Sequence, residues 1–169
     1  SAWNGPLPSA AALLPTKDAP RTKLLHLVRH AQGFHNIDKS VMKEEAGIDA
    51  RLTPEGREQC QRLQQATAEL RPELVISSPL SRTLETAQLS LGPQRATAGA
   101  PPLLAFEGIR ETVNFLCDTR RPISQVAKDY PDVDFSQCKD EPDMLWMRYA
   151  AEHGPQAVFR GHRESADLP

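Results

Sequence analysis

The stretch LLHLVRHAQGFHN, residues 24–36, decides the fold more than any other part of the chain. Its apolar first half predicts a buried parallel strand, because a short apolar run that ends in a polar turn is typical of one. Catalytic groups of α/β proteins lie just past the carboxyl ends of such strands, which is where Arg29 and His30 stand. The alternative is a strand that simply ends in a polar loop.

Helices and strands are predicted to alternate after this stretch. Residues 53–55 (Thr-Pro-Glu) give an N-cap residue, a proline at the first helical position and an acid in the first turn of a helix that Arg71-Pro72 ends. A strand follows at 74–76, then a helix that opens at Ser78-Pro79, then a strand at 103–106. The alternation predicts an α/β fold, a three-layer α/β/α sandwich around a mostly parallel central sheet.

The pattern is weaker beyond Glu107. Short helices are expected over 122–130 and 143–153, a loop over 131–141, and a strand of three apolar residues over 157–159.

The chain of 169 residues suits one domain. Residues 1–22 are rich in Ala, Pro and Ser, and we expect them to form an N-terminal extension or linker outside a domain over 23–169. A remnant of an organellar transit peptide is the alternative for this extension.

Composition narrows the classes of function. A formal net charge of −2 argues against a general nucleic-acid binder, which usually carries a basic patch. No apolar run approaches the ~20 residues of a membrane span. The three cysteines are odd in number and widely spaced, which favours a reducing, intracellular compartment, either cytoplasmic or organellar.

Chemically useful side chains follow the three predicted strands. Arg29 and His30 follow the first, Arg82 falls in the first turn of the helix after the second, and Glu111 comes after the third. Two arginines, an imidazole and a carboxyl group suit phosphoryl transfer, in which the arginines offset oxygen charge, the imidazole attacks and the acid protonates the departing oxygen. Taken singly, Arg82 could be a surface helix arginine and Glu111 a solvated acid. His35 either lines the same pocket or is a loop histidine, and its spacing from His30 does not suit a metal site.

Four motifs together resemble the histidine phosphatase superfamily, which has the phosphoglycerate-mutase-like fold. They are the segments LVRHAQG (27–33), LTPEG (52–56), SSPLSRT (77–83) and IRE (109–111). The similarity covers about residues 23–168. Three further segments look most like the plant and fungal phosphoglycerate-mutase-like proteins: 117–121, 134–136 and 145–146.

The resemblance implies a phosphomonoesterase that acts on a small phosphorylated metabolite through a phosphohistidine. It makes His30 the nucleophile, Arg29 and Arg82 phosphate ligands, and Glu111 the proton donor. Asn36 joins the substrate-binding candidates. The resemblance implies no metal and no organic cofactor, and mutase activity is the nearest alternative within the family.

The chain departs from the family pattern at its second active-site histidine, which in the family follows a late apolar strand. In one interpretation, residues 163–168 match the helix start that precedes this strand, so that the C-terminal part of the domain is missing. In the other, residues 157–159 are a shortened form of the strand and His162 is the second histidine. We favour the first interpretation.

In the family, this late strand lies centrally, beside the strand that carries Arg29 and His30. Its absence would leave backbone donors and acceptors unpaired in the interior. We therefore expect other protein, either a partner or a second copy of the chain, to cover the open sheet. A catalytically impaired phosphoglycerate-mutase-like subunit with a structural role in a larger assembly is the alternative function.

Overall fold

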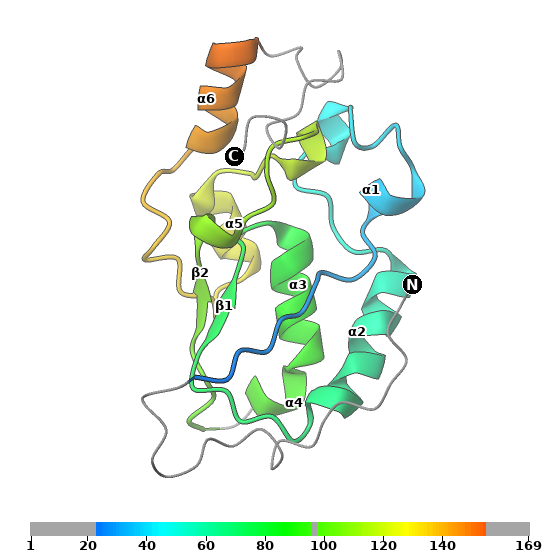
Figure 1. Cartoon of the computed structure of the whole chain (residues 1–169), viewed down its shortest axis with the longest axis vertical. Coiled ribbons are helices and arrows are strands. Elements are labelled where there is room, and N and C mark those ends of the chain that lie inside the picture. Colours follow the sequence, from blue (N-terminus) through cyan, green and yellow to red (C-terminus); the bar gives the residue numbers. More distant parts are fainter. Residues whose placement is uncertain (1–22, 96–97, 155–169) are drawn as a thin grey trace.

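The computed structural model describes residues 23–95 and 98–154. It contains two strands, β1 (Val75–Ser77) and β2 (Leu103–Ala105), which pair in parallel (Figure 1). Val75 lies opposite Leu103, and Ser77 lies opposite Ala105. The parallel pair joined through helices confirms the α/β class and the predicted strands at 74–76 and 103–106, each to within one residue.

Helices form most of the regular structure in the described residues. The α-helices are α1 (Phe34–Ile37), α2 (Pro54–Thr67), α3 (Ser81–Ser90), α4 (Gly92–Arg95), α5 (Ile123–Asp129) and α6 (Met144–His153). Short 3₁₀ turns are η2 (Glu45–Gly47), η3 (Glu107–Ile109) and η4 (Leu116–Asp118).

Two of the predicted helix starts are visible as caps, whereas the helix expected to open at Ser78-Pro79 begins at Ser81, and α2 ends at Thr67 rather than at Arg71-Pro72. The hydroxyl oxygen of Thr53 accepts from the backbone N–H of Gly56 at 3.0 Å, and Pro54 occupies the first turn of α2. Asp143 accepts from the backbone N–H of Trp146 at 3.0 Å and caps α6 in the same way. Such caps satisfy backbone donors that have no partner inside a helix.

One face of the sheet carries the main core. Leu103 and Ala105 of β2 pack there with Leu84 of α3 and with Val126 and Tyr130 of α5. Side chains alternate between the two faces of a strand, so Ile76 lies on the other face, where it is 47% exposed. The described residues therefore show helices on one face of the sheet, and a second helical layer is not among them.

The prediction of a buried strand over residues 24–28 is wrong for the described structure. These residues join no ladder of hydrogen bonds, and Leu27 is 92% exposed. The segment instead runs past α3, where the backbone N–H of Ala31 donates to the Thr86 hydroxyl at 3.0 Å (Figure 1). A strand needs a neighbouring strand for its backbone groups, and β1 pairs only with β2 among the described residues.

All three cysteines of the chain, Cys60, Cys117 and Cys138, are buried and free. No helix within residues 23–95 and 98–154 is both long and apolar enough to cross a membrane. The expected extension over 1–22, the expected strand over 157–159 and the candidate histidine His162 lie outside the described residues.

Candidate active site

His30 is half-buried and its ring is held by its own neighbour. Nδ1 lies 2.7 Å from the carbonyl oxygen of Ala31. Because a carbonyl oxygen can only accept, Nδ1 carries the proton of the neutral ring, and Nε2 keeps its lone pair. Burial is the main cause that lowers the pKa of His30, and the charges of Arg82 and Arg29 lower it further, while the Ala31 hydrogen bond and Glu111 raise it. A neutral imidazole with a free Nε2 is a competent nucleophile.

The segment that follows His30 is fixed to the start of α2 and to α1. The backbone N–H of Gln32 donates to the Gln59 side chain at 2.9 Å, and Gly33 pairs with Leu52 in an antiparallel bridge. The backbone N–H of Gly33 donates to Oδ1 of Asn36 at 2.9 Å. The exposed Asn36 therefore already uses its amide oxygen to hold the turn after His30.

Arg82 lies in the first turn of α3 and is only 1% exposed. Its Nη1 donates to the carbonyl oxygen of Cys117 at 2.7 Å, and its Nη2 donates to Asp118 at 3.0 Å. Its Nε is buried and has no partner among the described residues. The guanidinium group is thus held by the 117–118 turn, and its charge lowers the pKa of His30.

The N-terminus of α3 already holds a carboxylate. Asp49 accepts from the backbone N–H of Ser81 at 2.7 Å and from its hydroxyl at 2.6 Å, and Arg121 pairs with the same carboxylate at 2.9 Å. Negative charge is favourable at a helix N-terminus. Asp49 therefore positions the turn that carries Arg82.

Arg29 and Glu111 are both exposed. Oε1 of Glu111 accepts from the backbone N–H of Thr112 at 3.2 Å. Both charges act on the pKa of His30, as that of Arg82 does. Of these three charged residues, only Arg29 lines the same cavity as His30, and Arg82 and Glu111 are not among its lining residues.

The roles of two residues were not predicted from the sequence, although one of them, Asp118, lies in the 117–121 segment that carries part of the resemblance. Asp118 holds Arg82 from 36 positions away, and Asp49 holds Ser81 from 32 positions away. Neither stands in a motif at a predicted strand end, and contacts at such separation leave no local pattern in the sequence. In the structure, Asp49 is the only residue other than glycine within 23–95 and 98–154 that has a positive φ, at 54°.

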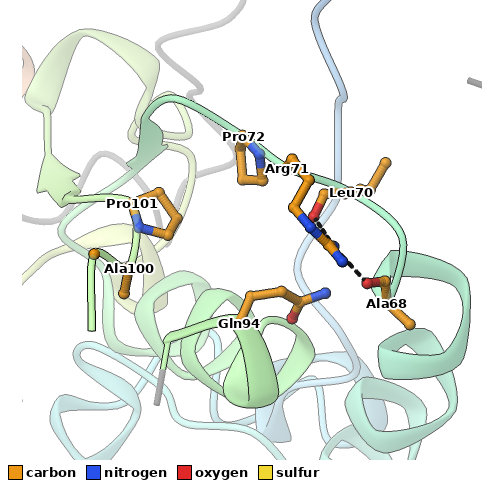
Figure 2. Close-up of a pocket in the computed structure, with 8 residues that line it drawn as sticks. Ala68, Leu70, Arg71, Pro72, Gln94, Ala100 and Pro101 are labelled. Carbon is orange, nitrogen blue, oxygen red and sulfur yellow. Dashed lines mark hydrogen bonds between the residues drawn. The ribbon is translucent and has the colours of Figure 1, made fainter. Parts of the chain in front are cut away.

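Two of the cavities differ in their lining. The one beside His30 has a volume of about 260 Å³ and is lined by Arg29, His30, Ala31, Gln59, Cys60, Leu63 and Thr86. The larger, of about 490 Å³, lies at the amino ends of the strands (Figure 2). Its one charged lining residue, Arg71, turns its guanidinium to the carbonyl groups of Ala68 and Leu70. The smaller cavity is therefore the candidate active site, because Arg29 and the His30 imidazole line it. The described residues form no cluster of three or more potential metal ligands.

The chain is similar to several characterised or named proteins. It is 35% identical over 173 residues to a phosphoglycerate mutase-like protein of Arabidopsis thaliana, which covers 83% of this chain and 64% of that protein. It is 29% identical over 123 residues to a probable phosphatase of Schizosaccharomyces pombe, covering 71% and 55%. A solved structure, the ecdysone phosphate phosphatase of Bombyx mori in complex with tungstate, aligns with a TM-score of 0.47 and 15% identity over 76% of this chain and 67% of that one.

The chain thus spans between about half and two thirds of the length of these curated relatives. The sequence pattern of the histidine phosphatase superfamily (branch 1) matches residues 25–160, which include Arg29, His30, Arg82 and Glu111. With that match over most of its length, and with phosphoglycerate mutase-like relatives among plant and fungal proteins, the chain belongs to the histidine phosphatase superfamily.

Proposed function

We propose that the protein hydrolyses the phosphomonoester of a small phosphorylated metabolite through a phosphohistidine at His30. The observation that carries this proposal is the contact of His30 Nδ1 with the Ala31 carbonyl oxygen at 2.7 Å, which leaves Nε2 with its lone pair. The lowered pKa of the ring keeps it unprotonated at neutral pH, as a nucleophile must be.

In the first step, Nε2 of His30 attacks phosphorus and the ester P–O bond breaks. The departing oxygen takes a proton from the carboxylic acid of Glu111, which is exposed and close enough to act on the pKa of His30. In the second step, water gives a proton to the Glu111 carboxylate and attacks phosphorus. The P–N bond breaks, inorganic phosphate leaves, and both side chains return to their starting forms.

The positive charges around His30 support a phosphorylated substrate. Arg29 and Arg82 both lower the pKa of His30, so both place positive potential where a phosphoryl group would sit. In our proposal they bind its equatorial oxygens, and Asn36 contributes to substrate binding from the same turn. Nη1 of Arg82 already donates to the Cys117 carbonyl oxygen and Nη2 pairs with Asp118, whereas Nε has no partner among the described residues and is the donor that we assign to the substrate.

The test is an assay of the whole chain with p-nitrophenyl phosphate, with the 31P spectrum followed for an acid-labile phosphohistidine. Unsubstituted protein should release inorganic phosphate, and His30→Ala should abolish both release and the covalent intermediate. His26→Ala is the matched control, because His26 is exposed and four residues away. Hydrolysis by the His30→Ala protein at the unsubstituted rate would exclude the proposed nucleophile. Return of the phosphoryl group to an acceptor, rather than to water, would indicate a mutase.

An alternative function is a catalytically impaired subunit with a structural role in a larger assembly. The exposed apolar residues of the 24–28 segment favour it, since such a surface is typically covered by other protein. The cover would be a partner protein or a second copy of the chain. Lack of turnover, together with isolation of the chain only in complexes, would favour this alternative over the enzyme.

We also propose that the protein works in an intracellular compartment, cytoplasmic or organellar. Its three cysteines are free, which suits a reducing environment. Fractionation of cells that express the full protein would test the location.

A further inference from the structure

His35 is a buried histidine beside His30 that the proposed reaction does not yet use. The two ring centroids lie 5.3 Å apart with the planes tilted by 52°. The His35 side chain is only 7% exposed, and its Nδ1 has no hydrogen-bond partner among the described residues. A buried polar nitrogen without a partner is unfavourable, because it has lost water and gained nothing in return.

The charges around His35 are those around His30. Burial is the largest cause that lowers the pKa of His35 to about 4, and Arg82, His30 and Arg29 lower it further. Arg82 and Arg29 also act on His30. The two imidazoles therefore share one positive environment, and an anion placed there would interact favourably with both.

The chain makes room for the His35 ring at Gly33. A Cβ at this position would lie 2.6 Å from Cε1 and 2.7 Å from Nδ1 of His35. The φ of Gly33 is −99°, which any residue can adopt, so the glycine is required for space and not for backbone freedom. Its absent side chain lets the imidazole nitrogen lie against the turn that directly follows His30.

We propose that His35 is a further substrate-binding residue, whose Nδ1–H donates to an oxygen of the phosphoryl group that reacts at His30. The inference rests on the proposed function, since it assigns a second imidazole to the same site. A neutral ring can donate from Nδ1 without carrying a charge of its own. The residue thus adds a directed hydrogen bond to an environment already rich in positive charge.

Substitutions can separate this role from simple packing. Phenylalanine fills nearly the same volume as histidine but has no N–H group. Asparagine places an amide nitrogen close to the position of Nδ1. A packing role predicts that His35→Phe is tolerated, whereas a binding role predicts that His35→Asn retains more function.

The experiment measures binding of inorganic phosphate to the whole chain by titration, with the imidazole 15N signals followed by NMR. The Nδ1 signal of His35 should shift on addition of phosphate. His35→Phe should weaken phosphate binding about tenfold or more, the effect of losing a hydrogen bond to a charged group. His35→Asn should recover part of that loss, and His26→Phe, at an exposed histidine, should bind as the unsubstituted chain does.

Thermal unfolding of each variant shows whether it is folded, and the NMR shift in the unsubstituted chain needs no variant at all. An unshifted Nδ1 signal, or unchanged phosphate affinity in His35→Phe, would overturn the role of His35. If one of these two results is found while the unsubstituted chain still hydrolyses phosphomonoesters through His30, the proposed function stands and only the binding role of His35 is overturned. A chain that neither binds phosphate nor turns over substrate would overturn both.

Discussion

His30 and His35 have adjacent rings, yet they differ in how each nitrogen is satisfied. Nδ1 of His30 has the Ala31 carbonyl as its partner, whereas Nδ1 of His35 has no partner among the described residues. The hydrogen bond of His30 keeps the proton on Nδ1 and leaves Nε2 as a nucleophile, whereas Nδ1 of His35 remains a donor for a bound oxygen. The proposed reaction uses the first imidazole for attack on phosphorus and the second for binding the phosphoryl group.

The buried His35 should make folding stability depend on pH. Its pKa is about 4 in the folded chain and 6.5 in the unfolded chain, so between these values the unfolded chain binds the proton and the folded chain does not. The free energy of unfolding should therefore be largest above pH 6.5 and fall as the pH drops toward 4, by about 3 kcal/mol in total from this group. Urea denaturation of the unsubstituted chain and of His35→Phe should show this dependence as a difference between the two. Equal dependence on pH in both proteins would contradict the assignment.

Glu111 should matter most when the leaving group is poor. Glu111→Gln removes the acid that protonates the departing oxygen in our proposal, and general acids of this kind contribute roughly 10²–10⁴-fold. Alkyl phosphates should lose turnover by about that factor, while p-nitrophenyl phosphate, which leaves readily as an anion, should lose little. Glu69→Gln, at an exposed acid that is not among the charges acting on His30, is the control and should leave both rates unchanged. Equal losses for both substrates would argue against the proton-donor role.

Arg29, His30, Arg82 and Glu111 are site candidates because they stand in short sequence motifs, although the residues before Arg29 form no strand in the described structure, and their catalytic roles stay predictions. His30 and Arg29 are adjacent in the chain, and a motif carries both at once. The partners of Arg82 could not be predicted, because the carboxylate of Asp118 and the carbonyl of Cys117 reach it only through the folded chain. A buried arginine needs such partners, and the sequence does not say which of several acids supplies them.

At the scale of elements, α3 depends on a carboxylate from outside the helix. Asp49 accepts two hydrogen bonds from Ser81 and pairs with Arg121, all at 2.9 Å or less. Asp49→Ala should lower the free energy of unfolding by about 3 kcal/mol, because it leaves the buried Ser81 N–H and hydroxyl without their acceptor and removes one of the two carboxylates that pair with Arg121. Asp49→Asn should cost less, since asparagine keeps an acceptor and tolerates the φ of 54°.

Denaturation by urea measures this loss. Asp140→Ala, at an exposed aspartate, should change stability by no more than about 0.5 kcal/mol and serves as the control. If Asp49→Ala were as mild as Asp140→Ala, the contacts at the start of α3 would contribute nothing to stability.

Helices and paired strands were predictable where local chemistry decides them. Thr53-Pro54 and Asp143 cap α2 and α6 as their residue types suggest. The strand predicted over 24–28 is absent because an apolar run favours burial of its side chains but does not supply a partner for its backbone. A strand forms only beside another strand that can pair with it, and the described residues contain no such partner for this segment.

At the scale of the whole molecule, several apolar side chains of the 24–28 segment are exposed. Leu25 and Leu27 are 79% and 92% exposed, and the pairing of Lys23 with Glu73 brings this segment beside the exposed Leu74. Surfaces of this kind promote association. We expect the isolated chain to self-associate in sedimentation velocity, and Leu27→Lys to weaken that association. Met147→Lys, at an exposed apolar residue of α6, should leave it unchanged. A chain that is monomeric at all accessible concentrations would contradict this expectation.

The three buried thiols can report where the protein unfolds first, because each becomes reactive only when its surroundings open. Burial raises the pKa of Cys117 to about 12 and of Cys138 to about 11, and it raises the pKa of Cys60 as well. Only the thiolate reacts with an alkylating reagent, so each thiol is silent at neutral pH while its surroundings stay closed. Cys60 lies on α2, Cys117 in the turn that holds Arg82, and Cys138 against β2. Mass spectrometry can follow the order in which an alkylating reagent labels the three thiols during unfolding. That order would show which of the three regions opens first.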